Sequence, residues 1–273
     1  MGYEQERIEN LIDKNVSELF HENTKQRRSD FQFIQRIISA MINPTFRSIT
    51  TTSYKHYYSG HKIMLPTSFP KAKKSFDRTV LSRRSRRVYS KKPLNILDIA
   101  KIMYFSNGIT EITRLDNEEI KQHFRSCPSA GALYPIEVYA IALNISDLPT
   151  GIYHYNPIEN SLESVSLKET KENLRMQLNK ITFTDEVGYA SLVIVLTGIP
   201  SRSRVKYGER GYRFMLIEAG HICQNILLTA TSLNFNSFPV GGFIDDELDY
   251  LLKIDGLEEM SLYIISIGKR PKV

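Results

Sequence analysis

The chain has 273 residues, enough for one large domain or for a core domain with an extension. It is 41% hydrophobic and 24% charged, the balance of a soluble globular protein with a sizeable core. The net charge of +6 suits an anionic cofactor, an acidic partner or nucleic acid and does not decide between them.

The two cysteines, Cys127 and Cys223, provide no disulfide framework and no pair at metal-ligand spacing, so we expect no metal site. Residues 1–14 carry charges of both signs without an apolar segment, and we expect no signal peptide. The longest apolar run, residues 190–199, is far shorter than the roughly 20 residues of a membrane span. These features predict a cytoplasmic protein without membrane contact.

Residues 1–74 differ from the rest and are predicted to form an extension. Residues 30–43 have helical apolar spacing, with Asp30 as the N-cap and an end before Pro44. Residues 45–74 are rich in Ser, Thr, Tyr and Lys, as in an irregular arm that lies over a body. We expect residues 75–273 to form the main domain.

Strands and helices alternate irregularly in this domain, which favours an α+β layered body. The amphipathic run 96–105 predicts a helix that Asn95 caps and that Asn107-Gly108 ends. The remaining predicted elements are a strand at 137–143, a hairpin of 151–155 and 162–165 about Asn156-Pro157, a helix at 167–180, a buried central strand at 191–197, a helix at 245–252 and a final strand at 261–267.

Residues 211–234 predict a long helix that is apolar nearly all round. Such a helix must be buried on every side, in a core or across a subunit interface. His221 lies inside it, and we expect this side chain to be hydrogen-bonded in the core rather than catalytic.

The first motif with chemical potential is a basic segment, residues 83–87, which reads Arg-Arg-Ser-Arg-Arg. If it is extended, Arg83, Ser85 and Arg87 point to one side, and guanidinium groups with a hydroxyl can bind a phosphate. A solvated basic stretch is the simpler alternative. Nucleic-acid binding has no support because no aromatic residues are interleaved, so no nucleic-acid partner is predicted.

Two further motifs contain small residues that permit close approach by a planar group. Residues 128–135 read Pro-Ser-Ala-Gly-Ala-Leu-Tyr-Pro, and residues 239–243 read Pro-Val-Gly-Gly-Phe. Ordinary tight turns are the alternative for both. A fourth motif, Lys206-Tyr207 in an Arg-rich segment that we expect to be a loop, could be an acid–base pair, since nearby cations and burial lower the pKa of a lysine. Solvated loop charge is its alternative.

In this order, the motifs resemble those of the flavin-dependent nitroreductase superfamily, and specifically its SagB-type peptide dehydrogenases, also called thiazole/oxazole oxidases. The likeness covers about residues 75–270. Ala132 and Tyr134 stand where simple nitroreductases usually carry Asn and Gln, and Gly241 stands where they often carry an acid; both departures agree with the peptide-dehydrogenase branch. Besides the motifs above, the matching segments are Gly-Ile-Tyr-His-Tyr-Asn-Pro at 151–157, Lys-Tyr-Gly-Glu-Arg-Gly-Tyr-Arg-Phe at 206–214 and Glu-Ala-Gly-His-Ile-Cys-Gln-Asn at 218–225.

The resemblance implies a nitroreductase-like sandwich with a central mixed sheet, helices on both faces and a long buried central helix, assembled as an intertwined homodimer. It also implies an FMN site between the subunits, in which one subunit lends residues 128–132 to the flavin of its partner. Lys206 and Tyr207 match the catalytic pair associated with azoline oxidation. The implied flavin-binding residues are Arg83, Arg84, Ser85 and Arg87, then Pro128, Ser129, Ala130, Gly131 and Ala132, then Pro239, Gly241, Gly242 and Lys269.

The activity implied by the resemblance is FMN-dependent oxidation of thiazolines or oxazolines to azoles in a ribosomally made peptide. A precursor peptide and a cyclodehydratase complex would be the partners. One alternative is a generic NAD(P)H-dependent flavin reductase of nitro or quinone compounds. Another is a non-catalytic scaffold subunit of a peptide-modifying complex.

Overall fold

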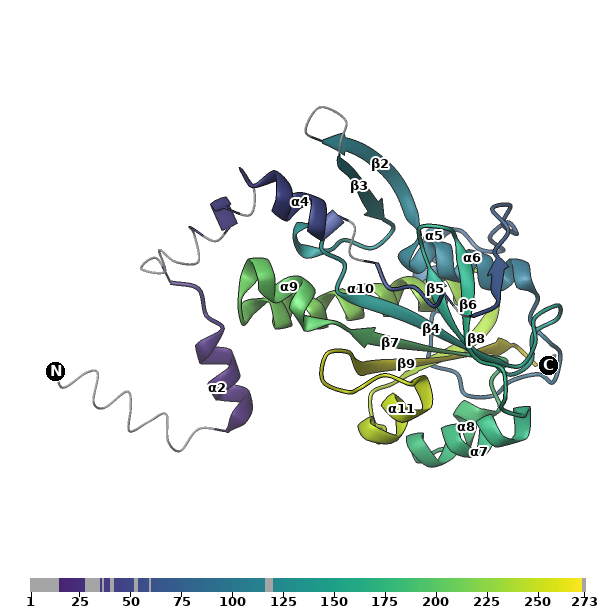
Figure 1. Ribbon diagram of the computed structural model, residues 1–273. Coiled ribbons are helices and arrows are strands. Elements are labelled where there is room, and N and C mark those ends of the chain that lie inside the picture. Colours follow the sequence, from purple (N-terminus) through teal and green to yellow (C-terminus); the bar gives the residue numbers. More distant parts are fainter. Residues whose placement is uncertain are drawn as a thin grey trace.

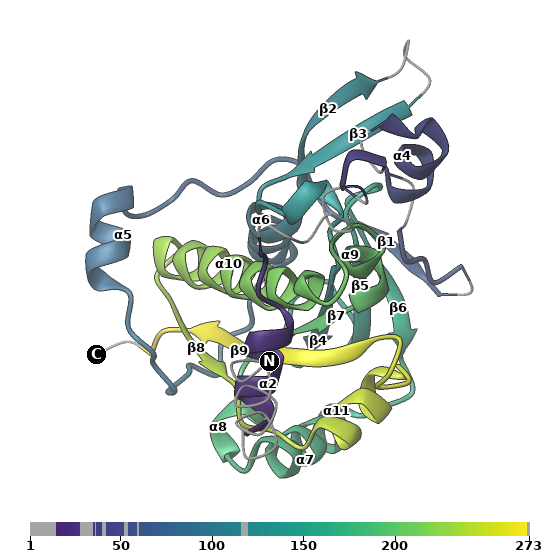
Figure 2. The same cartoon turned by 90° about the vertical axis from the view of Figure 1, so that its left-hand side faces the viewer.

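The computed structural model describes residues 15–27, 35, 37–39, 42–51, 54–58, 60–115 and 120–271. They form a seven-stranded sheet with helices on both faces, so the predicted α+β layered class is confirmed (Figures 1 and 2). A two-stranded hairpin, β2 (Ile109–Leu115) and β3 (Ile120–Arg125), projects from this body (Figure 1).

The sheet has the strand order β1-β6-β5-β4-β7-β9-β8, which places β4 and β7 at its centre. The predicted hairpin is confirmed as β5 and β6, and the predicted central strand as β7. The strands are β1 (Lys62–Met64), β4 (Ile136–Ala142), β5 (Gly151–Asn156), β6 (Ser161–Ser166), β7 (Leu192–Gly198), β8 (Phe235–Val240) and β9 (Met260–Lys269).

The prediction of a mixed sheet is wrong, because every pair of neighbouring strands in this sheet is antiparallel. Parallel pairing occurs in two isolated bridges, Ser85 with Ser237 and Leu94 with Ile145. Apolar residues on both faces of a strand are typical of parallel sheets. Here they arise because helices cover both faces of the sheet, and that burial does not depend on strand direction.

Two helices, α6 (Ile96–Asn107) and α10 (Arg210–Ser232), pack together on one face of the sheet (Figure 2). Alternate residues of β7, such as Ile194, face the core beneath them. The other face carries α7 (Lys171–Thr182), α8 (Asp185–Gly188) and α11 (Asp245–Leu252). Val193 and Val195 of β7 face that second core, so β7 is buried on both sides as predicted.

The long helix is not buried all round within the single chain; of the two predicted environments, core and subunit interface, the core accounts for one side. The side of α10 that faces the sheet and α6 is buried, for example at Ile222 and Ile226. On the other side Leu216 is 43% and Ile217 is 54% exposed, and His221 is exposed rather than part of the core. Nothing lies within 4 Å of the position that a Cβ on Gly220 would take. An apolar stripe therefore remains on the surface of this helix.

Four further α-helices of the described residues lie outside these layers, and none of the described helices is long and apolar enough to cross a membrane. Of the helix predicted at 30–43, Asp30 and residues 31–34, 36, 40 and 41 lie outside the described residues. The described residues 35, 37–39 and 42 are helical and Asn43 is not, so the predicted end before Pro44 is confirmed, and Pro44 then begins a new helix, as a proline in the first turn permits. The four are α2 (Val16–Asn23), α4 (Pro44–Thr51), α5 (Phe76–Ser82) and α9 (Pro200–Tyr207).

Residues of the predicted extension contact the rest of the chain at several places. Arg210 of α10 donates to the carbonyl oxygen of Thr24 at 2.9 Å, and the rings of Phe20 and Tyr212 meet edge to face at 5.7 Å. Further along, the backbone N–H of Tyr57 donates to the Glu163 carboxylate at 2.7 Å. The strand β1 then adds to the edge of the sheet beside β6.

Asn95 provides a direct test of the predicted helix start. Its side chain accepts from the N–H of Asp98 at 2.8 Å, in a capping box. We expect Asn95→Ala to lower the free energy of unfolding by about 1 kcal/mol because this acceptor is lost. Asn95→Asp keeps an acceptor and should be close to the parent in denaturant unfolding. An equal loss in both variants would contradict the capping role.

Candidate functional site

The segment of residues 128–134, here called the Gly131 loop, is a tight turn with unusual backbone angles. Gly131, Ala132 and Tyr134 have φ angles of 65°, 53° and 45°, in the left-handed region that disfavours residues with a side chain. The Ser129 hydroxyl oxygen accepts from the N–H of Tyr134 at 2.9 Å, and the Tyr134 hydroxyl accepts from the N–H of Arg125 at 2.9 Å. These bonds hold the loop in a conformation that the chain would otherwise avoid.

Lys206 and Tyr207 occupy the last turn of α9, so the prediction that they lie in a loop is wrong. Pro200 starts this helix at a position that suits proline, and Gly208, with a φ angle of 57°, ends it before α10 begins. The sequence suggests a loop because Gly208 and Gly211 and the many arginines obscure the end of α9 and the start of α10. The helix gives both side chains fixed directions.

The Gly131 loop and the end of α9 lie in direct contact. A Cβ added to Gly131 would come within 2.6 Å of the Tyr207 hydroxyl oxygen and 3.0 Å of Lys206 Nζ. No side chain fits there without displacing one of these groups. The structure thus brings together two of the four motifs, although 75 residues of sequence separate Gly131 from Lys206.

Burial acts on the two side chains in opposite directions. It lowers the pKa of Lys206, which favours the neutral amine that can accept a proton. It raises the pKa of Tyr207, which keeps the hydroxyl protonated and able to donate. The Tyr207 ring also packs edge to face on Phe214 at 5.0 Å, which fixes its position against α10. A lysine with a lowered pKa and a tyrosine that stays protonated therefore stand side by side.

A buried charge network joins α9 to the sheet and to the loop. Arg202 of α9 donates to the Tyr134 carbonyl oxygen at 3.1 Å and pairs with the Glu137 carboxylate. Glu137 also binds His154 Nε2 at 2.6 Å. Burial alone would raise the pKa of Glu137, but Arg202 and His154 outweigh it and lower the pKa. Burial would lower the pKa of His154, but Glu137 and Glu163 outweigh it and raise the pKa.

The basic segment of residues 83–87 lies against β8. Ser85 pairs with Ser237, and the Arg86 N–H donates to the Ser237 carbonyl oxygen at 3.0 Å, so the segment is extended as the phosphate hypothesis requires. The Arg87 guanidinium lies 5.0 Å from the centre of the Phe238 ring. The Arg84 guanidinium donates to the carbonyl oxygen of Arg83, the residue that caps the C-terminal end of α5, at 2.7 Å.

The glycines after β8 stand next to open space. A Cβ on Gly242 would meet nothing within 4 Å, and one on Gly241 would meet only the Tyr263 ring, at 3.8 Å. Pro239 lies on β8 opposite Ile265. Lys269 ends β9, where its carbonyl oxygen accepts from the N–H of Ser90 at 2.8 Å. These residues and the basic segment thus surround the same edge of the sheet.

The sequence prediction missed two further cations near this edge, Lys74 and Arg78. Burial and then the positive charges of Arg270, Arg86 and Arg78 lower the pKa of Lys74. Such mutual repulsion indicates a concentration of positive charge that suits an anion. The position of Lys74 and Arg78 shortly before the basic segment was the signal that could have found them.

Within one chain the two groups of candidate residues lie apart. Figures 1 and 2 show α9, which carries Lys206 and Tyr207, and α5, which leads into the basic segment, toward opposite ends of α10. The Gly131 loop belongs to the first group and residues 239–242 and Lys269 to the second. The structure therefore places the candidate residues in two separate groups, here called half-sites.

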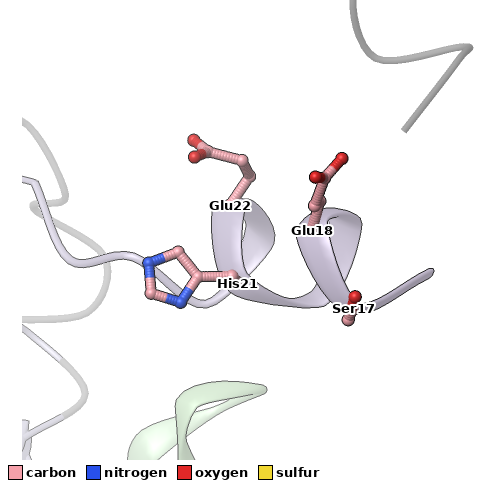
Figure 3. A pocket seen from close by; sticks show the side chains of 4 residues that line it. All are labelled: Ser17, Glu18, His21 and Glu22. Carbon is pink, nitrogen blue, oxygen red and sulfur yellow. The ribbon is translucent and has the colours of Figure 1, made fainter. Parts of the chain in front are cut away.

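A pocket of about 350 Å³ lies along α2 and is lined by Ser17, Glu18, His21 and Glu22 (Figure 3). One helix supplies all four side chains, and none belongs to the candidate groups. Among the described residues, no cluster of three His, Cys, Asp or Glu side chains could hold a metal ion.

Comparison with known proteins identifies relatives of the chain. It is 30% identical over 191 residues, 70% of its length, to a protein of Methanocaldococcus jannaschii that is named as a nitroreductase, and it covers 89% of that protein. It is also 30% identical over 135 residues to the microcin B17-processing protein McbC of Escherichia coli, which matches 48% of this chain and 49% of McbC.

Solved structures with less than 25% identity share the fold. One is a protein of Anabaena variabilis named as a nitroreductase, with a TM-score of 0.70 and 23% identity over 93% of this chain and 46% of that one. Another is a chain of the Escherichia coli microcin synthetase McbBCD complex with truncated pro-MccB17 bound, with a TM-score of 0.56 and 21% identity over 93% of this chain and 86% of that one. This chain spans about half the length of the Anabaena chain.

The model of the nitroreductase family matches residues 80–269, which contain both half-sites and the whole of the sheet except β1. Members of this family typically bind flavin. The chain belongs to the nitroreductase family.

Proposed function

We propose that the chain is an FMN-dependent dehydrogenase that oxidises azoline rings of a ribosomally made peptide to azoles. The observation that carries the proposal is the contact of Lys206 and Tyr207 with the Gly131 loop. The similarity to McbC, a protein that processes microcin B17, supports a peptide as the substrate. Thiazolines and oxazolines, formed from Cys, Ser or Thr, are the rings that such an enzyme would oxidise.

The chemistry requires loss of a hydride and a proton from the ring. Bound FMN would supply the acceptor for the hydride. Lys206, as a neutral amine, removes the ring proton, and the protonated Tyr207 hydroxyl assists by hydrogen bonding. Because Gly131 has no side chain, the azoline ring can lie against its backbone and be oriented there. Because the product is aromatic, the protein mainly supplies orientation and a base.

The residues at the β8 edge fit a flavin mononucleotide. Within the described part of the chain, neither Arg83 nor Arg87 forms an ion pair with a carboxylate, so both can bind a phosphate. The lack of close neighbours beside Gly241 and Gly242 supports the approach of a planar ring there. The residues that would hold the group are Arg83, Arg84, Ser85, Arg87, Pro239, Gly241, Gly242 and Lys269, with Pro128, Ser129, Ala130, Gly131 and Ala132 contributed by a second copy.

The phosphate assignment predicts the cofactor content of a variant. Arg83→Ala with Arg87→Ala should purify without FMN, because several charge-assisted hydrogen bonds, each worth roughly 1.5–3 kcal/mol, are lost. Absorbance and released flavin measure the occupancy. Lys168→Ala with Lys180→Ala removes the same charge from exposed positions and should keep its flavin. Full flavin in the Arg83/Arg87 variant would refute the assignment.

The catalytic assignment predicts variants that keep the cofactor and lose the reaction. Lys206→Ala and Tyr207→Phe should each slow the oxidation of a defined azoline peptide by roughly 10²–10⁴-fold, since a general base or its helper is lost. Mass spectrometry detects the reaction as the loss of two hydrogens. Flavin content and heat stability should equal those of the parent. Near-parental turnover would mean that another group removes the ring proton. Loss of flavin or of the fold would mean that Lys206 and Tyr207 have a structural role instead.

We further propose that two copies form an obligate, intertwined dimer, which would bring the two half-sites together. The apolar stripe on α10, with Leu216, Ile217 and the unobstructed Gly220, supports a helix of a second copy crossing there. An obligate interface buries roughly 2,000 Å² or more. A precursor peptide and a cyclodehydratase complex would be the further partners. A chain of the same fold occurs in the microcin synthetase McbBCD complex with truncated pro-MccB17 bound, which supports partners of this kind.

The stripe gives the dimer a direct test. Ile217→Asp should produce monomers in light scattering at micromolar concentration and lose flavin with them, because a charge cannot be buried unpaired in an apolar contact. Met176→Asp places the same charge at an exposed apolar position on α7, away from the stripe, and should stay dimeric. A parent protein that is monomeric and fully loaded with flavin would disprove the shared site.

A second candidate function is an NAD(P)H-dependent reductase of nitro or quinone compounds. The relative in Methanocaldococcus jannaschii, named as a nitroreductase, favours it. Rapid reduction of the bound flavin by NADPH, without oxidation of azoline peptides, would decide for this reductase.

A further inference from the structure

Glu218 of α10 is an acid buried inside an apolar helix. Its side chain is on the face toward the Gly131 loop, and the residue is 2% exposed. Neither carboxyl oxygen has a hydrogen-bond partner among the residues that the structure describes. A buried, unpartnered acid is costly, and where it occurs beside a candidate site it is a candidate functional group.

The groups that face this carboxyl come from several elements. The Ser129 hydroxyl lies beside it without a well-formed hydrogen bond, and the Cys127 thiol lies near enough for the Glu218 charge to contribute to its raised pKa. Arg125 of β3 is 7% exposed, and its Nε and Nη1 also lack partners within the described ranges. The Arg125 guanidinium is held 4.4 Å from the centre of the Tyr134 ring.

Burial raises the pKa of Glu218 to about 7, while Ser129, Arg125 and Arg202 act in the opposite direction. The Glu218 charge in turn contributes to the raised pKa values of Cys127 and Tyr134, after the larger effect of burial. A glutamine at this position would avoid the cost of a buried charge. The carboxyl is therefore poorly explained by packing alone.

We infer that Glu218 is a positioning residue of the Lys206–Tyr207 site, whose proton uptake and release adjust the Gly131 loop through Ser129 and Arg125. The ionised carboxylate accepts from the Ser129 hydroxyl and attracts the Arg125 guanidinium. Ser129 is bonded to Tyr134, and the two residues bracket Gly131, which stands against Tyr207 and Lys206. Protonation of Glu218 weakens its interactions with the Ser129 hydroxyl and the Arg125 guanidinium. One proton is exchanged with solvent, and no electrons move.

This role rests on the proposed function only where turnover is concerned, so the first measurement does not use it. In flavin-loaded protein, the infrared band of a protonated carboxyl should disappear with a midpoint near pH 7 and be absent from Glu218→Gln. Ser129→Ala should move the midpoint upward, because the hydroxyl lowers the pKa. Amide exchange of residues 128–134, corrected for its intrinsic pH dependence, should change over the same range in the parent and not in Glu218→Gln.

The second measurement is turnover. The parental kcat for an azoline peptide should inflect at the midpoint found by infrared spectroscopy, and Glu218→Gln should lack this inflection with its flavin retained. Glu172→Gln, a matched change at an exposed residue of α7, should keep it. Because the folded-state pKa is raised, the melting temperature of the parent should fall as pH rises from 4.5 to 7, and less so in Glu218→Gln.

The outcomes separate the two hypotheses. A carboxyl that titrates in the ordinary glutamate range, or loop exchange in Glu218→Gln that still changes with pH as in the parent, would overturn the inference whether or not the protein oxidises azolines. A titrating carboxyl and a responsive loop in a protein without azoline oxidation would support the inference and refute the proposed function instead.

Discussion

The buried carboxylate of Glu137 holds the candidate catalytic region together. It lies on the central strand β4 and binds Arg202 of α9 through one oxygen and His154 of β5 through the other. Arg202 also bonds the carbonyl oxygen of Tyr134, so the same guanidinium fixes α9 and the Gly131 loop. Removing one member would leave buried charges unpaired, which costs more than the pair contributes. The geometry at Gly131 depends on this network.

Covering the sheet on both faces has consequences for where chemistry can occur. The two cores occupy the faces of β4 and β7, which leaves the ends and edges of the sheet for function. Lys206 and Tyr207 lie in the last turn of α9, the helix that follows β7. The basic segment pairs with β8 at the edge of the sheet. α10 runs between them (Figure 2). Its residues Leu216 and Ile217 are exposed. Under the proposed function, this separation requires a second copy for a complete site.

Glu218 and the Glu137 network show two ways of burying an acid. Glu137 has an arginine and a histidine as partners, and its pKa is lowered. Glu218 has no hydrogen-bond partner within the described residues, and its pKa is raised to about 7. The first acid stabilises a fixed arrangement because its charge is permanent. The second can change its charge near neutral pH, which is why it is suited to adjust the loop that the first one anchors.

The sequence by itself determined the layered class, the capped helix after Asn95, the β5–β6 hairpin, and the buried strand β7, because local periodicity and turn chemistry specify these elements. It also identified the candidate residues that the structure gathers into two half-sites. Only the tertiary structure decided strand direction, the helical state of Lys206 and Tyr207, and the exposed stripe of α10, because these depend on contacts between distant segments. The partners of Glu137 and the isolation of Glu218 were decided in the same way: nothing local in the sequence pairs Arg202 with Glu137, or leaves Glu218 without a hydrogen-bond partner among the described residues.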